Sequence, residues 1–98
     1  MTGALDIRHQ PAAGGGEFVL ERDGKRVGEL GYSITGTQMT IRHTEVDPRL
    51  RGRGAARQLL DAAVAFAREQ GYQVVPRCSY ARVVFARSPA AFADVIAA

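Results

Sequence analysis

A glycine-punctuated turn at residues 51–56 is the most informative chemical motif in this 98-residue chain. A strand-like segment precedes the turn and a helical pattern follows it, so its backbone N–H groups fall where a helix has unpaired donors and partial positive charge. Glycine lets the backbone approach an anion because no Cβ stands in the way. The turn therefore predicts a phosphate site, with a plain helix-capping surface turn as the alternative. Its residues are Arg51, Gly52, Arg53, Gly54, Ala55 and Ala56.

Two common phosphate loops do not fit this motif. The turn lacks the lysine and hydroxyl residue of a Walker loop and the G-x-G-x-x-G spacing of a dinucleotide fold. The chain has a formal net charge of +3, and its basic residues are scattered apart from a group of four at this turn, Arg49, Arg51, Arg53 and Arg57. A nucleic-acid-binding domain usually carries a wider basic stripe, so a small phosphorylated ligand is favoured and nucleic acid is kept as a lesser hypothesis.

Cys78 is a candidate nucleophile, because it stands where a helix is expected to begin. A thiol at a helix N-terminus gives up its proton more readily, which supplies thiolate for attack on a thioester. The alternative is a small buried hydrophobe. Because Cys78 is the single cysteine, it forms no internal disulfide, which agrees with a reducing compartment. No apolar run approaches the roughly 20 residues of a membrane span and the N-terminus lacks a secretion signal, so a cytoplasmic protein is expected.

His43 and Glu45 form a candidate acid–base pair. They lie two residues apart on one expected strand and therefore face the same side. A histidine beside a carboxylate can accept a proton at neutral pH. Met39 and Ile41 are expected on that same face, which favours a partly buried pair; the alternative is a sheet histidine satisfied by a local hydrogen bond. Two histidines and one cysteine, widely spaced, do not predict a metal site.

Hydrophobic periodicity predicts a single α+β domain spanning residues 1–98. Alternating segments joined by the turns at Asp23-Gly24 and residues 35–37 predict an antiparallel meander. The apolar stripe from Ala56 to Ala67, closed by Gly71, predicts an amphipathic helix. In order, the expected elements are a short edge strand at 5–9, a loop at 11–16, strands at 17–22, 26–34 and 39–46, a helix at 55–70, a strand at 72–76, a helix at 79–87 and a last helical turn within 90–98.

Three segments in order carry a resemblance to a family. They are His43-Thr44-Glu45-Val46, then Leu50-Arg51-Gly52-Arg53-Gly54 with its helix, then Val74 to Tyr80. With the R-x-x-G-x-A form of Arg51 to Ala56, the chain resembles the GNAT acetyltransferases, and in particular a branch of small single-domain N-acetyltransferase-like proteins. The resemblance covers the chain from Phe18 to its end.

The resemblance implies a minimal GNAT fold, a bent mixed sheet whose fourth and fifth strands splay apart to admit acetyl-CoA. It implies that Glu45 and Val46 contact the pantetheine arm and the acetyl carbonyl through the main chain. It also implies that Arg51 to Ala56 offer N–H groups to the pyrophosphate. It assigns Cys78 to an acyl-enzyme route. Tyr80 resembles the general acid of GNAT enzymes, with core packing as the favoured alternative.

These observations lead to two main functional hypotheses. The first is an acetyl-CoA-dependent N-acetyltransferase acting on an unknown amine or protein, without a metal. The second is a non-catalytic acyl-CoA-binding module acting with a partner protein, suggested because too few residues precede Phe18 for the acceptor-side helices of larger GNAT enzymes. An exposed meander edge is compatible with either a monomer or a homodimer.

Overall fold

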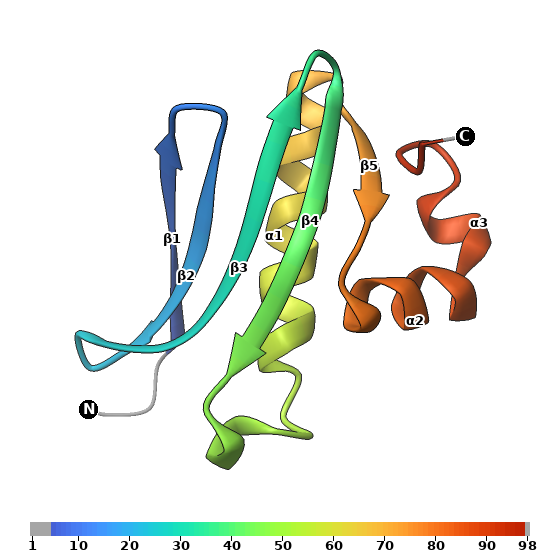
Figure 1. The fold of residues 1–98 in the computed structure, drawn as a ribbon. Coiled ribbons are helices and arrows are strands. Elements are labelled where there is room, and N and C mark those ends of the chain that lie inside the picture. The colour runs from blue at the N-terminus through green and yellow to red at the C-terminus, as the bar shows by residue number, and fades with distance from the viewer. Residues whose placement is uncertain (1–4, 98) are drawn as a thin grey trace.

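The computed structural model describes residues 5–97, which form one five-stranded sheet with a long helix against one face (Figure 1). The strands lie in sequence order, β1-β2-β3-β4-β5. The elements are β1 Leu5–Ala12, β2 Gly15–Arg22, β3 Lys25–Thr35, β4 Gln38–Val46, the 3₁₀ helix η1 Pro48–Leu50, α1 Ala55–Gln70, β5 Gln73–Pro76, α2 Ser79–Arg87 and α3 Pro89–Phe92. This order confirms the α+β meander followed by helix, strand and helix.

The first hairpin is longer than its sequence indicates. Residues 11–16 were expected to form a loop, but β1 continues through Ala12 and β2 begins at Gly15. The prediction of a loop was wrong because consecutive glycines carry no alternation of side chains. Gly15 is needed there because a Cβ would overlap the carbonyl oxygen of Tyr32 on β3, so the two backbones lie unusually close.

α1 covers the face of the sheet that we call the inner face. Leu59, Leu60 and Val64 on the helix are buried against Phe18 and Leu30 from the strands. Burying one such side chain contributes about 2 kcal/mol before entropy is counted. The helix ends at Gly71, whose left-handed backbone lets its N–H bond to the carbonyls of Ala67 and Arg68. The predicted apolar stripe is therefore the one that holds the domain together.

β4 and β5 are parallel neighbours for only part of their length. The pairing joins Gln38–Ile41 to Gln73–Pro76. It stops where the N–H groups of Arg77 and Cys78 both donate to the Ile41 carbonyl, at 2.9 and 3.1 Å. Beyond Ile41, β4 continues to Val46 while the chain from β5 turns into α2. The expected divergence of these two strands is confirmed.

A β-bulge at Arg42 divides β4 into two halves. Tyr32 pairs with Ile41 and Gly31 pairs with His43, so Arg42 has no partner on β3. Because the extra residue shifts the alternation by one, Thr44 faces inward whereas His43 faces outward. The expectation that His43 and Glu45 share a face with Met39 and Ile41 was therefore wrong. His43 and Glu45 do share a face, but it is the outer face, away from α1.

The C-terminal segment covers the far edge of β5. Val74 forms a parallel bridge with Ile96, its N–H donates to the Val95 carbonyl, and Ala97 returns a bond to the Val74 carbonyl. The expected last helical turn is α3, whose Phe92 packs on Phe85 of α2. Residue 98 lies outside the described range. None of the helices within residues 5–97 is both long and apolar enough to cross a membrane.

Candidate functional site

A hollow of about 830 Å³ lies where β4, the loop before α1 and the start of α2 meet. It opens beside residues 42–46 of β4, which lie along β3 but do not pair with β5 and which we call the unpaired half of β4. The divergence of β4 and β5 therefore gives the hollow one wall. The glycine-punctuated turn and the first turn of α1 give it another. The residues around it are Thr44, Glu45, Val46, Pro48, Leu50, Arg51, Gly52, Gly54, Ala55, Ala56, Arg57 and Tyr80.

The N-terminus of α1 has no cap of its own in the described structure. Gly54 occupies the N-cap position in a left-handed conformation, with φ 78°, and no side chain bonds to the first turn. The first turn also contains no acidic residue. An uncapped helix start with glycine before it presents N–H donors and partial positive charge to the hollow. An anion such as a diphosphate is the chemical complement of this arrangement.

The loop that leads to Gly54 is anchored at its base. Leu50, at the end of η1, is only 3% exposed and belongs to the core. Asp47 caps η1 by accepting from the Arg49 N–H at 2.9 Å, and it also binds the Arg49 guanidinium. These bonds to Arg49 lower the pKa of Asp47 to about 2. A buried leucine and a capped turn hold the glycine loop in place beside the hollow.

The arginines near the loop differ in availability. Arg49 is bound to Asp47, and Arg57 is bound to Asp61 at 2.9 Å. Arg51 and Arg53 are exposed, and neither forms an ion pair with any residue of the described range. Arg51 lines the hollow, whereas Arg53 does not. Of the four clustered arginines, Arg51 is therefore best placed to meet an anion there.

Cys78 stands at the start of α2, as expected, and its sulfur atom is the helix cap. The Ala81 N–H donates to Cys78 Sγ at 3.3 Å. Thr44 Oγ1 lies 3.5 Å from the same sulfur atom, in an orientation that allows either atom to donate. Cys78 is half-buried, and Thr44 is the residue that connects it to the hollow. The thiol thus does not line the hollow itself but contacts a residue that does.

Tyr80 both packs on the core and lines the hollow. A phenol is protonated at neutral pH at its ordinary pKa, and burial raises the pKa of Tyr80 further. A protonated phenol at the wall of the hollow can donate a proton to a leaving group. Core packing and a chemical role are therefore compatible for Tyr80, because its side chain contacts the core and also lines the hollow.

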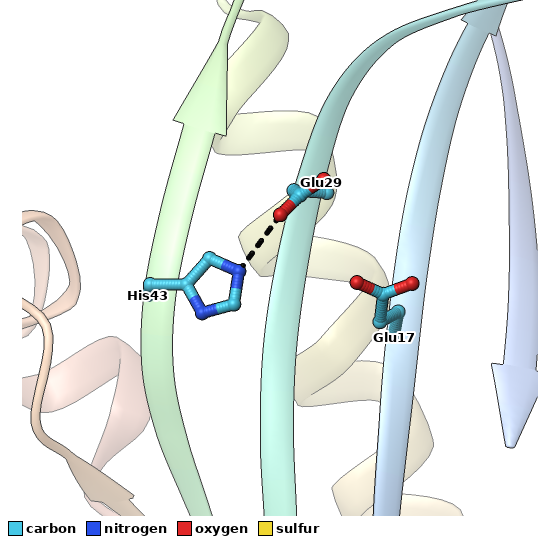
Figure 2. A group of neighbouring side chains, drawn as sticks. All are labelled: Glu17, Glu29 and His43. Atoms are coloured by element: carbon cyan, nitrogen blue, oxygen red, sulfur yellow. Dashed lines mark hydrogen bonds and ion pairs between the residues drawn. The ribbon is translucent and has the colours of Figure 1, made fainter. Parts of the chain in front are cut away.

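His43 belongs to an ion-pair network on the outer face, which Figure 2 shows spread over β2, β3 and β4 with α1 behind. His43 Nε2 lies 3.0 Å from Glu29 Oε2, and Arg26 bonds to both Glu29 and Glu17, at 2.9 and 2.8 Å. The hydrogen bond from His43, followed by the charge of Arg26, lowers the pKa of Glu29. Glu17, Glu29 and His43 offer ligand atoms within 4.8 Å of one another, but both carboxylates are already in ion pairs with Arg26.

The structure brings some of the predicted site residues together and separates others. Most of the predicted cofactor residues lie around one hollow, with Cys78 behind Thr44; Arg53 lies outside it. His43 lies outside it as well, on the outer face of the sheet among the ion pairs of Glu29 and Arg26. Sequence reasoning missed Thr44, because its contact with Cys78 depends on the bulge at Arg42.

Sequence reasoning also gave no role to His9, which lies in an aromatic cluster on the inner face. Its ring stacks on Phe18 with centroids 4.2 Å apart and meets the edge of Phe66. Its Nε2 lies 2.6 Å from the hydroxyl of Tyr32. Burial lowers the pKa of His9. These contacts fasten the edge strand β1 to the core, which is a structural role.

Comparisons with known proteins agree with this geometry. The sequence profile of a family described as GCN5-related N-acetyl-transferase matches residues 17–95. No curated protein is similar enough in sequence to match the chain.

Solved structures share the fold. A GCN5-like protein from Staphylococcus aureus has a TM-score of 0.73 at 26% identity, with 95% of this chain and 88% of that chain covered. An IAA acetyltransferase from Bacillus cereus has a TM-score of 0.69 at 18% identity, covering 86% and 74% of the two chains. A GNAT family N-acetyltransferase from Escherichia coli, solved in complex with CoA, has a TM-score of 0.55 at 29% identity, covering 61% and 38%. Since the family profile spans residues 17–95, the chain belongs to the GCN5-related N-acetyltransferases, a family of acetyl-CoA-dependent acyltransferases.

Proposed function

We propose that this domain binds acetyl-CoA in the hollow beside β4 and transfers the acetyl group to an amine. The observation that carries the proposal is the uncapped N-terminus of α1, which opens into a hollow walled by the unpaired half of β4. In this arrangement the N–H groups of residues 51–56 hold the diphosphate, and Arg51 adds a positive charge. The main chain of Glu45 and Val46 holds the pantetheine arm and the acetyl carbonyl.

Cys78 is the nucleophile of the favoured route. Its thiolate attacks the acetyl carbonyl, so that a new carbon–sulfur bond forms at Cys78 and the carbon–sulfur bond to CoA breaks. CoA leaves as a thiolate, to which Tyr80 can donate a proton from the wall of the hollow. The acceptor amine then attacks acetyl-Cys78, so that the amide bond forms, the carbon–sulfur bond to Cys78 breaks and the thiolate returns; the proton that the amine loses goes back to the phenolate of Tyr80. The contact of the sulfur with Thr44, which lines the hollow, supports this route.

Direct transfer is the second route, and His43 or Glu45 then serves as the base, acting through a water molecule. Both side chains face the outer side of the sheet, so an amine approaching from that side would meet them beside the unpaired half of β4. The bond to Glu29 holds the imidazole of His43 in one orientation. The physiological acceptor and acyl group are open in both routes.

A non-catalytic acyl-CoA-binding module is the alternative function, since the hollow alone suffices for binding. This alternative predicts stoichiometric binding of acetyl-CoA without acetyl transfer to the protein or to any of a panel of amines and peptides. Both functions place the protein in the cytoplasm, where the free thiol of Cys78 stays reduced.

Intact-mass measurement after incubation with acetyl-CoA separates these possibilities. Acylation of Cys78 adds about 42 Da, and the adduct is absent in Cys78→Ala and released by hydroxylamine. Binding with turnover but without the adduct, impaired in His43→Gln, identifies the direct route. Binding of acetyl-CoA without turnover or adduct supports the binding module, and absence of binding overturns the proposal as a whole.

A further inference from the structure

Thr44 both lines the hollow and contacts the thiol of Cys78. Its hydroxyl oxygen is 3.5 Å from the sulfur atom, and the Ala81 N–H reaches the same sulfur at 3.3 Å from the side of α2. The two groups that contact the sulfur come from different elements, β4 and α2, which are distant in sequence. The sulfur is therefore held from two sides at the point where the two elements meet.

The bulge at Arg42 is what places Thr44 there. With regular alternation, Thr44 would share a face with the outward-pointing Arg42. The extra residue reverses the second half of the strand, so that Thr44 pairs with Leu30 on the inner face. Thr44 consequently faces the core and α2, whereas its neighbours His43 and Glu45 face outward. The bulge at Arg42 is thus the reason that the hydroxyl group of Thr44 contacts the thiol of Cys78.

We infer that Thr44 is a positioning residue for Cys78: its hydroxyl group, together with the Ala81 N–H, orients the sulfur atom at the edge of the hollow and stabilises its ionised form. This inference rests on the proposed function for its catalytic meaning. A hydroxyl group can accept from a thiol S–H and donate to a thiolate, so Thr44 serves both states without losing its own proton. After acylation the thioester sulfur is a poor acceptor, and the hydroxyl is released while acetyl-Cys78 awaits the amine.

Other charged groups near the sulfur come from α1 and α2. Burial raises the pKa of Tyr80, and the charges of Arg57 and Asp61 on α1 act on the same phenol. Arg77 precedes Cys78 in the chain. A substitution at Thr44 leaves all of these unchanged, so a difference between variants reports the hydroxyl group.

The test measures alkylation of Cys78 by iodoacetamide across pH, in the absence of acetyl-CoA, for Thr44→Val and Thr44→Ser. Valine has the shape of threonine without the hydroxyl group, and serine retains it. We expect Thr44→Val to slow alkylation about tenfold near neutral pH, since it removes a donor to a charged group. The rates converge at alkaline pH, where the thiol ionises unaided, and Thr44→Ser stays within about twofold of wild type.

A matched control is Thr40→Val on the same strand, because Thr40 pairs with Ser33 and Val75, away from the thiol. Its alkylation curve is expected to follow wild type. Superimposable curves for Thr44→Val and wild type, or a reduction equal at every pH, overturn the inference, since the latter reports access alone. If circular dichroism shows that Thr44→Val is unfolded, Thr44→Ala is measured on the same criteria.

The alkylation experiment tests the role of Thr44 independently of the proposed function, because alkylation requires no acyl donor. Formation of acetyl-Cys78 in wild type, combined with unchanged alkylation of Thr44→Val, refutes the role of Thr44 and retains the transferase. If Thr44→Val slows alkylation near neutral pH but wild type forms no acetyl adduct, Thr44 remains the partner of the thiol and the acyl-enzyme route is excluded.

Discussion

The two halves of β4 show how one strand can serve both stability and function. From Gln38 to Ile41 the strand has neighbours on both edges, and Met39 and Ile41 are fully buried. From Arg42 to Val46 it keeps β3 on one edge only, and its last three residues line the hollow. The change occurs within two residues, at the bulge and at the carbonyl of Ile41.

The two halves differ in how many of their backbone hydrogen-bonding groups are already paired with a neighbouring strand. In the first half the backbone groups are used by β3 and β5, so side-chain packing decides the contribution of each residue. In the second half, β5 does not cover one edge of β4, so the backbone groups on that edge can bond to a bound molecule. We therefore expect substitutions in the first half to reduce stability, and changes around the second half to reduce binding.

The largest expected effect is loss of acetyl-CoA binding in Gly54→Val. A branched side chain at φ 78° both strains the loop and places a side chain where the diphosphate must approach. We expect affinity to fall by at least about a hundredfold in calorimetry. Gly24→Val is the matched control, because Gly24 has φ 79° and open space around it but lies in the β2–β3 turn. Equal loss of binding in the two variants would mean that strain, and not the site, is responsible.

Met39→Ala tests the first half of the strand. The side chain is fully buried, so its truncation is expected to lower the free energy of unfolding by about 2–5 kcal/mol. Acetyl-CoA affinity of the folded protein should stay close to wild type. Val46→Ala, in the second half, is expected to show the converse, a smaller loss of stability and a measurable loss of affinity. Urea denaturation and calorimetry on both variants check this, and similar profiles for the two contradict the division of β4.

Deletion of Arg42 tests the bulge itself. Removal of the unpaired residue permits continuous pairing with β3, and His43 and Thr44 keep their present faces. We expect a folded protein with affinity for acetyl-CoA reduced about tenfold, because a bulge bends the strand that forms the wall of the hollow. Arg42→Ala retains the bulge and should bind as wild type does. Wild-type affinity in the deletion variant would show that strand divergence alone shapes the site.

The smallest expected effect is an acid sensitivity located far from the hollow. Because burial lowers the pKa of His9 in the folded state, the unfolded chain takes up a proton first as the pH falls below the ordinary value of 6.5. Protonation of His9 therefore leaves the free energy of unfolding unchanged above pH 6.5 and lowers it below that pH. His9→Phe keeps the stacking on Phe18, and its stability should decline less between about pH 7 and 5. Denaturation midpoints at several pH values measure the two slopes; parallel slopes would exclude His9 as the source.

Much of the fold was predictable because its signals are local. Alternation in residues 17–22 located strand β2 to within two residues, and the apolar stripe of residues 55–70 located helix α1 at its observed bounds. The bulge reverses the faces of all later residues in β4, but it could not be predicted from the sequence. The first inward-facing residue after it is Thr44, which is polar, so no apolar residue next to the bulge marks the shift in alternation. For the same reason the sequence located Cys78 at a helix start but concealed its contact with Thr44 and placed His43 on the wrong face. The site depends on tertiary register, which composition does not encode.

Gly31 has a consequence for how such chains can diverge. Its missing Cβ leaves the space in which the imidazole of His43 lies, and a side chain there would overlap that ring. Positions 31 and 43 are therefore expected to be replaced together over evolutionary time. A lineage that acquires alanine or a larger residue at position 31 must first give up the ring at position 43. Sequencing of natural variants would show this as a statistical coupling between two strands, readable without any assay.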